Sequence, residues 1–472
     1  MPLIEPVPLL PVDRLGAVHF IGVGGAGMSG IAAMYAELGV DVSGSDQADS
    51  AMLKRLRQDG VRTVVGHHRD NLGNAEAVVV SSAIRADNPE LSAARERGLR
   101  IWHRSAALGA LMMGRRGVAV TGTHGKTTTS AMIATVLTRL GADPGYVVGS
   151  PLTATGQNHR LGAGAPFVVE ADESDGSFRQ YPAEIVVITN IESDHLDNWG
   201  DAEAYASGFL AVATAATVEV VILNADDPGT AALIDPVRAA GKTVITVGED
   251  ASAQVRLTEV STPPGGGVAQ LISARDQGIV ELVVPGRFNL HNAAAAYAVA
   301  LALGLSGEPA REALGGFRGT HRRFQPVAEV GGARIFDDYA HHPTEVAATL
   351  GAARELAGDS RLVVCFQPHL FTRTRDFATE FGRVLSSADH ILVLDIYPAR
   401  EDPLPGVTGR LVADAAATVA GAERVSYAAS VHDGAQALAQ LIRPGDVVVT
   451  IGAGDVTAVG PLVADLLRTR PA

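Results

Sequence analysis

The sequence predicts an α/β protein of three domains, in which apolar strands alternate with helices along the chain. The length supports this division, because 472 residues exceed the size of one ordinary domain. Continuous apolar runs such as 185–190 and 218–224 are typical of strands buried on both faces of a parallel sheet. Two glycine-rich turns, near residues 22 and 122, each join such a strand to a helix. We expect domains at 1–109, 110–318 and 319–472.

The composition is that of a globular protein, with 47% hydrophobic and 19% charged residues, and it excludes several classes of function. The net charge of −14 argues against a nucleic-acid partner, which would need a basic face. No apolar run reaches the roughly 18 residues of a membrane-spanning helix, and the first residues lack a secretory signal. The single cysteine, Cys365, excludes an internal disulfide bond and fits a reducing compartment. We therefore expect a cytoplasmic protein, monomeric or homodimeric, with neither a membrane nor a nucleic-acid partner.

The first segment predicts a strand, a Gly22-x-Gly24-x-x-Gly27 turn, a helix, and a second strand that ends at Asp46. Such a turn holds a pyrophosphate at the N-terminus of its helix, and either NAD or a nucleotide-diphosphate substrate would supply one. A later strand, 78–84, carries two serines toward its C-terminal end. The candidate binding residues of this segment are Gly22, Gly24, Gly25, Gly27, Met28, Ser29, Asp46, Ser81 and Ser82.

The second segment begins with a phosphate loop between an apolar strand, 118–121, and a helix. Lys126 would reach the terminal phosphates of ATP, and the Thr127 hydroxyl would bind Mg²⁺. The loop has the short G-x-x-G-K-T form, because Val120 stands where a longer loop carries glycine. The candidate ATP-binding residues in the loop are Gly122, Thr123, His124, Gly125, Lys126, Thr127 and Thr128.

Polar clusters follow several of the predicted strands, where ligands bind in open α/β sheets. Glu170 opens an acidic run after one strand of the second segment, and His195 follows the next. Hard oxygen donors suit Mg²⁺, so both residues are candidate metal ligands, although a solvated acidic loop or a helix cap would have similar sequences. Residues 254–285 predict a small antiparallel patch, followed by a long alanine-rich helix.

The third segment repeats the α/β rhythm and carries histidines and arginines after its strands. The pair His341 and His342 at a strand–helix turn fits a small polar ligand, a phosphate, a metal or a plain turn. His369, Arg373 and Arg375 form a candidate anion site, because the arginine fork matches carboxylate and phosphate. These clusters predict a cleft between the second and third segments.

Taken together, the motifs resemble those of the Mur ligase family over almost the whole chain. The resemblance is carried, in chain order, by GVGGAGMSGIA, SSAIRADNPE, GTHGKTTT, EADESDGSF, TNIESDHLDNW, NADDP, RRFQ, DDYAHHPTEV, FQPHLFTRTRDF and IYPAREDP. It implies a Rossmann-like domain for a UDP-sugar, a central ATPase domain, and a Rossmann-like domain that closes on an amino acid.

The resemblance implies that ATP drives the ligation of L-alanine to the lactyl carboxylate of UDP-N-acetylmuramate through an acyl phosphate. Lys126 would stabilise the transferred phosphoryl group, Thr127 would bind one Mg²⁺, and Glu170 and His195 would bind a second. Asn292 would hold adenine, although the motif here reads Phe288-Asn289-Leu-His291-Asn292 where relatives often have H-N-x-x-N. No lysine lies between Lys126 and Lys242, so the carbamylated lysine of several relatives is absent. The alanine and muramoyl pocket would comprise Tyr339, His341, His369 and Arg373, with His341 and Arg373 counted among the catalytic residues.

Three other functions fit parts of the sequence. A murein-peptide recycling ligase would attach a tripeptide to the same sugar nucleotide. An NAD-dependent dehydrogenase would explain the first glycine turn but has no need of the phosphate loop. A nucleotide-regulated binding module would bind the UDP-sugar without turnover.

Overall fold

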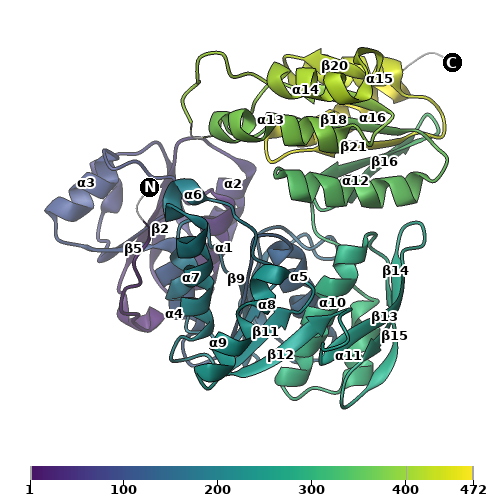
Figure 1. The fold of residues 1–472 in the computed structure, drawn as a ribbon. Helices are drawn as coiled ribbons and strands as arrows, with labels where there is room; N and C mark the ends of the chain where they lie inside the picture. The colour runs from purple at the N-terminus through teal and green to yellow at the C-terminus, as the bar shows by residue number, and fades with distance from the viewer. Residues whose placement is uncertain (1–2, 400, 470–472) are drawn as a thin grey trace. The chain divides into compact units, whose positions relative to one another are not determined.

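The computed structural model describes residues 3–399 and 401–469, which form a three-domain α/β fold with mostly parallel sheets, as predicted (Figure 1). The chain divides into two compact units. The first comprises Met1–Thr258, Gln270–Val280 and His291–Phe317, and the second comprises Glu259–Ala269, Glu281–Leu290 and Arg318–Ala472. The predicted boundaries near residues 109 and 318 stay predictions.

The N-terminal domain is a five-stranded parallel sheet of order β3-β2-β1-β4-β5, which is the Rossmann order without its sixth strand. One face of the sheet packs on α1 and α4, and Leu91 and Ala94 of α3 pack on the other. The elements are η1 (Val12–Arg14), β1 (Val18–Ile21), α1 (Ala26–Glu37), β2 (Val42–Asp46), α2 (Ala51–Gln58), β3 (Arg62–Val65), η2 (Arg69–Leu72), β4 (Ala77–Val80), α3 (Pro89–Glu96), β5 (Arg100–His103) and α4 (Arg104–Met112).

The central domain is built on a ten-stranded sheet of order β15-β14-β13-β12-β11-β10-β6-β9-β7-β8. Its core strands β9, β6, β10, β11 and β12 are parallel and apolar on both faces, so both faces are covered. The elements are β6 (Arg116–Thr121), α5 (Lys126–Arg139), β7 (Gly145–Val147), β8 (His159–Arg160), β9 (Pro166–Glu170), η3 (Ser177–Gln180), β10 (Ile185–Ile188), α6 (Leu196–Trp199), α7 (Ala202–Ala213), β11 (Val220–Asn224), α8 (Pro228–Ala231), α9 (Ile234–Ala239), β12 (Thr243–Gly248), β13 (Val255–Ser261), β14 (Gly267–Ile272), β15 (Gln277–Leu282), α10 (Arg287–Ala302) and α11 (Gly307–Leu314).

The C-terminal domain has a six-stranded sheet of order β16-β17-β21-β18-β19-β20, in which only the β16–β17 pair is antiparallel. Helices α12, α13 and α14 pack on one face, and α15 and α16 pack on the other, where Cys365 is buried. The elements are β16 (Gln325–Val330), β17 (Ala333–Asp338), α12 (Pro343–Ala357), β18 (Leu362–Phe366), α13 (Phe371–Leu385), β19 (His390–Leu394), α14 (Arg410–Ala420), η4 (Ala422–Arg424), β20 (Val425–Ala428), α15 (Val431–Leu441), β21 (Val447–Ile451), η5 (Asp455–Ala458) and α16 (Val459–Arg468).

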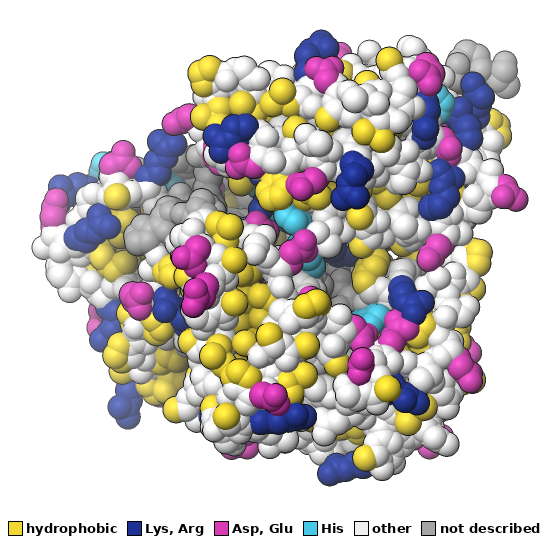
Figure 2. Space-filling model, viewed as in Figure 1, with side chains coloured by type: hydrophobic (Ala, Val, Ile, Leu, Met, Phe, Trp, Pro, Cys, Tyr) yellow, Lys and Arg dark blue, Asp and Glu magenta, His cyan; other side chains and the backbone are white. Residues whose placement is uncertain are grey.

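The surface mixes charges of both signs. In Figure 2, basic and acidic side chains are scattered among one another over the face shown. Within the described part of the chain, no helix combines the length and apolar character needed to cross a bilayer.

Candidate nucleotide and ligation site

The phosphate loop lies where the sequence predicts it, between β6 and α5. Gly125 precedes α5 with φ +83°, a conformation that favours glycine, and a Cβ there would lie 2.9 Å from Asn292 Oδ1. Apolar residues Ile133, Val136 and Leu137 of α5 are fully buried, which holds the helix N-terminus beneath the loop. Because the first N–H groups of a helix have no partner inside it, this end is suited to bind phosphate.

Lys126 is folded back onto its own loop. Its Nζ donates to the carbonyls of Gly122 and Thr123 at 2.7 and 2.9 Å and to Glu173 Oε1 at 2.9 Å. Burial lowers the pKa of Lys126, but the nearby carboxylates, with Glu173 foremost, raise it more, so the ammonium stays charged. Glu173 lies in the acidic run after β9, and its importance to Lys126 is visible only in the fold.

Thr127 and Glu170, two of the three predicted metal ligands, contact each other. Thr127 Oγ1 donates to Glu170 Oε1 at 3.0 Å, and the Gly149 N–H donates to the other carboxylate oxygen at 2.6 Å. A Cβ at Gly149 would lie 2.5 Å from Glu170 Oε2, so a larger residue there would displace the carboxylate. Among the described residues, the buried Glu173 Oε2 accepts no hydrogen bond. A hydroxyl, a carboxylate and this unsatisfied oxygen are hard donors that fit Mg²⁺.

His195 is placed differently from the other two predicted ligands. It has the left-handed backbone conformation, with φ +54°, directly before α6. Its Nε2 lies 3.5 Å from Asp194 Oδ2 and 4.0 Å from Glu173 Oε1. Non-glycine residues in this conformation are uncommon and cluster at functional sites, where the surrounding structure holds them. The structure therefore places His195 beside Glu173, and its ligation of a metal stays a prediction.

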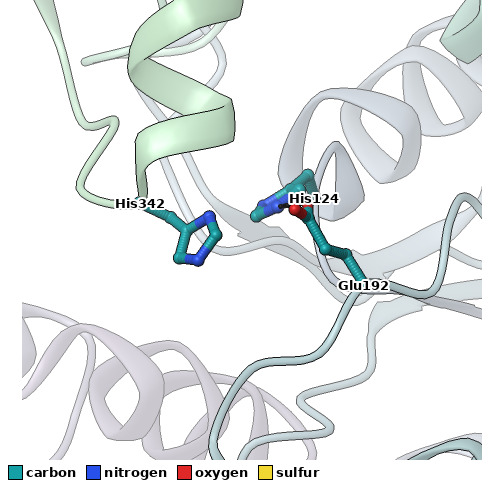
Figure 3. A group of neighbouring side chains, drawn as sticks. All are labelled: His124, Glu192 and His342. Atoms are coloured by element: carbon teal, nitrogen blue, oxygen red, sulfur yellow. Dashed lines mark hydrogen bonds and ion pairs between the residues drawn. The ribbon is translucent and has the colours of Figure 1, made fainter. Parts of the chain in front are cut away.

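His124, within the phosphate loop, contacts the strand-end loop after β10. Its Nε2 lies 3.1 Å from Glu192 Oε2, and Figure 3 shows the two side chains next to each other. The backbone N–H of His124 donates to Asn190 Oδ1 at 2.8 Å. Figure 3 also draws His342, which precedes α12 in the second unit. Sequence reasoning missed Asn190 and Glu192 as partners of the loop, although both stand in the motif TNIESDHLDNW.

Asn292, the predicted adenine contact, is buried in α10 beside the phosphate loop. Its Oδ1 accepts from Thr129 Oγ1 at 3.0 Å. The preceding residue, His291, lies 2.9 Å from Asp226 Oδ2 and 3.5 Å from Glu249 Oε1, so two carboxylates orient its ring. Asp226 belongs to the motif NADDP, which the sequence analysis left without a role.

The Gly22–Gly27 turn is tied to the end of β2. The N–H groups of Gly22 and Val23 donate to the Ser45 carbonyl at 2.8 and 2.9 Å, and that of Gly24 donates to Asp46 Oδ2 at 2.9 Å. Gly25 is the N-cap of α1. Asp46 therefore shapes the turn, and the helix N-terminus behind it has the geometry of an anion site.

Four other predicted residues of this domain differ in accessibility. Met28 and Ser29 are buried, and their N–H groups already donate to the Gly25 carbonyl at 2.9 Å. Ser82 donates to Asp175 Oδ2 at 2.5 Å, which joins the N-terminal domain to the acidic run of the central domain. Ser81 is partly buried just after β4. Ligand contacts by these residues stay predictions.

The predicted pocket residues of the second unit form one cluster. The ring centroids of Tyr339 and His341 are 5.3 Å apart, and those of His341 and His369 are 5.6 Å apart. Tyr397 stacks on His369, with centroids 6.0 Å apart and planes 13° apart. Leu370 has φ +67°, and its N–H donates to the Tyr397 carbonyl at 3.0 Å, which fixes the turn that presents His369. Sequence reasoning missed Tyr397 as a member of this cluster.

The cluster is held by polar contacts and carries positive charge. Arg322 lies over the Tyr339 ring at 4.8 Å from its centroid and donates to the Gly452 carbonyl at 2.6 Å. Burial lowers the pKa of His341 to about 3, helped by Arg373 and His369 and opposed by Glu345, so the ring is neutral at pH 7. Arg373 is buried in the first turn of α13.

Arg375, the other arginine of the predicted anion site, is on the surface. It pairs with Asp376 at 2.7 Å and is more than half exposed. The structure therefore favours Arg373 over Arg375 as the cluster's arginine. Arg400, in the motif IYPAREDP, lies outside the described residues.

A phosphate loop with its lysine, threonine and acidic partners, on a three-domain α/β fold, defines an ATP-dependent enzyme. Comparison with known proteins narrows this class, and the chain belongs to the Mur ligase family. Residues 17–116 match "Mur ligase family, catalytic domain", residues 120–300 match "Mur ligase middle domain", and residues 322–454 match "Mur ligase, glutamate ligase domain".

Similar proteins extend over the full chain. The chain is 57% identical over 470 residues to the UDP-N-acetylmuramate–L-alanine ligase of Cutibacterium acnes, covering 99% of each. It is 52% identical to the ligase of the same name from Kineococcus radiotolerans, covering 97% of this chain and 98% of the relative.

Solved structures agree with this assignment. The UDP-N-acetylmuramate-alanine ligase of Thermotoga maritima superposes with a TM-score of 0.80 at 29% identity, covering 96% of this chain and 99% of that one. A murein peptide ligase from Psychrobacter arcticus superposes with a TM-score of 0.71 at 24% identity, covering 97% and 100%, and shares the fold.

Proposed function

We propose that the protein is a UDP-N-acetylmuramate–L-alanine ligase, which uses ATP to join L-alanine to the lactyl carboxylate of the sugar nucleotide. The observation that carries the proposal is the convergence of Lys126, Thr127 and Glu170 at one helix N-terminus, in a chain 57% identical to a ligase of that name. The products are UDP-N-acetylmuramoyl-L-alanine, ADP and phosphate.

In the first half-reaction, a lactyl carboxylate oxygen attacks the γ-phosphorus, and the bond to the β,γ-bridging oxygen breaks. The products of this step are an acyl phosphate and ADP. Lys126 neutralises charge on the transferred phosphoryl group, so it must turn from the carbonyls of its own loop toward the nucleotide. Bound Mg²⁺ neutralises phosphate charge and draws the two anionic reactants together. Thr127 would hold one ion, and Glu170 and His195 would hold a second.

In the second half-reaction, the neutral amine of L-alanine attacks the acyl carbon, phosphate leaves, and the amine nitrogen gives up one proton as the amide forms. We assign alanine binding to the cluster of Tyr339, His341, His369 and Arg373. Arg373 supplies a fork that matches the alanine carboxylate, and the neutral, aromatic surroundings of His341 suit a short side chain. A pocket sized for one methyl group discriminates against glycine by about 1–3 kcal/mol.

The remaining predicted residues bind the two nucleotides. The phosphate loop, Gly122 to Thr128, would cradle the ATP phosphates, and Asn292 would meet adenine. The Gly22–Gly27 turn would hold the diphosphate of the UDP-sugar. A cytoplasmic location and a monomeric or homodimeric state stay predictions from the sequence.

The proposal is tested by phosphate release from ATP with Mg²⁺, UDP-N-acetylmuramate and one amino-acid acceptor at a time. We expect release that depends on L-alanine, together with a product heavier than the sugar nucleotide by one alanyl residue. Release with the tripeptide L-alanyl-γ-D-glutamyl-meso-diaminopimelate but not with L-alanine would instead identify a murein-peptide ligase. ATP-independent reduction of NAD would overturn the ligase assignment altogether.

A further inference from the structure

Arg104 is a partly buried cation that the sequence analysis left without a role. It is the first residue of α4, after the edge strand β5 of the N-terminal sheet. Its Nη2 donates to Asp172 Oδ2 at 3.0 Å, and its side chain is 23% exposed. Burial lowers its pKa, but the carboxylates, with Asp172 foremost, raise it more, so the guanidinium is charged.

The same guanidinium lies against the glycine turn of the first nucleotide site. A Cβ built on Gly27 would lie 3.2 Å from Arg104 Nη1. Gly27 is in the first turn of α1, where N–H groups without helical partners face outward. Arg104 therefore lies beside the N-terminus of α1, which is suited to bind an anion.

Most of the donors of Arg104 are unused within the described part of the chain. Of its guanidinium nitrogens, only Nη2 makes a hydrogen bond to the residues that the structure describes. Arginine carries five N–H donors in a planar fork, so Nε and Nη1 are able to bind a second anion while Nη2 keeps Asp172. The Arg104 side chain is 23% exposed, so these donors are open to a ligand.

A second polar group close by is also unsatisfied. The Tyr181 hydroxyl makes no hydrogen bond within the described residues, and the side chain is 7% exposed. Burial raises its pKa, and Arg104 lowers it, because the guanidinium is near enough for its charge to act on the phenol. Tyr181 is thus a second polar group with unused hydrogen-bonding capacity that is influenced by the charge of Arg104.

The surrounding charges explain why a cation is needed there. The acidic run contributes Asp172 and Asp175, whose carboxylates face the N-terminal domain through Arg104 and Ser82. These carboxylates would repel a diphosphate on the Gly22–Gly27 turn. A guanidinium between them and the turn offsets part of this repulsion.

We propose that Arg104 binds the diphosphate of the sugar nucleotide, using the Nη1 and Nε donors while Nη2 remains on Asp172. The inference rests on the proposed function, because it takes the UDP-sugar as the ligand of the first domain. Asp172 is two residues from the predicted metal ligand Glu170, so Arg104 connects the diphosphate site to the acidic run beside Lys126. This contact would position the sugar nucleotide relative to the site of phosphoryl transfer.

The test is calorimetric titration of the full-length protein with three ligands: UDP, UDP-N-acetylglucosamine and UDP-N-acetylmuramate. All three carry the diphosphate, and only the last carries the lactyl carboxylate. We expect Arg104→Gln to weaken all three by a similar factor, about 10- to 100-fold for a charge-assisted contact. Arg104→Lys should recover part of the loss, because it keeps the charge and loses the fork.

The control is Arg69→Ala, since Arg69 is an exposed arginine of the same domain that pairs with Glu96 on the surface. It should bind all three ligands as the wild type does. In steady-state assays, Arg104→Gln should raise the KM for the sugar nucleotide and leave the KM for ATP unchanged. This split separates ligand binding from a general loss of structure.

Two outcomes with Arg104→Gln would overturn the inference. Unchanged UDP affinity in folded Arg104→Gln protein would show that the guanidinium does not reach the diphosphate. A loss confined to UDP-N-acetylmuramate would assign Arg104 to the carboxylate instead. If the wild type binds none of the three ligands, the proposed function itself fails. If Arg104→Gln does not fold, the Arg104→Lys titrations decide, and wild-type affinities there would overturn the inference.

Discussion

Lys126 Nζ lies 2.9 Å from Glu173 Oε1, and the two residues form a buried ion pair at the phosphate loop. Glu173 is 1% exposed and Lys126 16%. The lysine predicted to reach the ATP phosphates therefore contacts a carboxylate and two loop carbonyls. ATP must compete with these contacts for Lys126. The Lys126–Glu173 pair therefore couples ATP binding at the phosphate loop to the acidic run that contains Glu173.

Lys126→Ala should lower kcat by about 10²–10³-fold, because it removes the cation that stabilises charge on the transferred phosphoryl group. Phosphate release under saturating substrates measures the effect. Lys54→Ala is the matched control, since Lys54 is an exposed lysine of α2, and it should keep wild-type kcat. Full activity in the Lys126→Ala protein would refute the assigned mechanism.

Glu173→Ala should destabilise the protein by about 1–3 kcal/mol, because it leaves the Lys126 ammonium without its carboxylate in a buried place. Urea unfolding of Glu173→Ala, Lys126→Met and the double variant forms a thermodynamic cycle. We expect the double variant to be less destabilised than the sum of the single variants. Additive effects would mean that the two charges do not interact in the folded state.

Gly149→Ala should raise the Mg²⁺ concentration needed for half-maximal activity. The added Cβ would lie 2.5 Å from Glu170 Oε2, so the carboxylate must leave its position beside Thr127. Activity is titrated with Mg²⁺ at fixed ATP. Gly351→Ala provides the control, because a Cβ at this helical glycine of α12 meets no atom within 4 Å. An unchanged Mg²⁺ dependence in Gly149→Ala would argue against Glu170 as a ligand.

The Glu90 carboxylate should make stability depend on pH in the acid range. Glu90 is buried and accepts hydrogen bonds from Ser45 Oγ and Asn71 Nδ2, each at 2.5 Å. Burial disfavours its ionised form, but contacts with His19, Ser45 and Asn71 outweigh burial and lower its pKa to about 2. The titratable groups that face it are His19 at 3.6 Å and His67 at 3.3 Å, and the backbone N–H of His68 donates to it at 3.2 Å.

Because the folded pKa of Glu90 is depressed, its contribution is complete above pH 4.5 and is lost as the pH falls toward 2. The contribution is on the order of 2–3 kcal/mol. Unfolding free energies measured from pH 6 to pH 3 should fall less steeply in Glu90→Gln than in the wild type. Parallel curves would exclude Glu90 as a source of the dependence.

His341 should not titrate in the range of the assay. Its pKa is lowered to about 3, mainly by burial, so it is neutral from pH 5 to pH 9. We expect the pH profiles of kcat/KM for L-alanine to have the same shape in the wild type and in His341→Gln. Neither profile should have an inflection near pH 6.5 that comes from this ring. A pH profile measured with both proteins decides this, and an inflection lost in the variant would mean that the ring is protonated when alanine binds.

Local sequence determined the secondary structure around the nucleotide sites, because the signals there are short in range. The strand–glycine–helix pattern at Gly22–Gly27 and at Gly122–Thr127 depends on a few adjacent residues, and both turns lie where they were predicted. The helix α10 likewise follows from its run of alanines. The spacing of the residues did not identify the reaction. The ligase reaction was predicted from the resemblance of the ordered motifs to one family.

Tertiary structure alone decided which of these residues meet. Glu173, Tyr397 and Arg104 belong to motifs or elements visible in the sequence, yet their partners are 47, 28 and 68 residues away. Charge and residue type do not specify such pairs, because a carboxylate is satisfied by any cation that the fold brings within reach. The sequence by itself named the two nucleotide turns and the acidic run. The parallel sheets brought the ends of their strands together, and this made the run a partner of both Lys126 and Arg104.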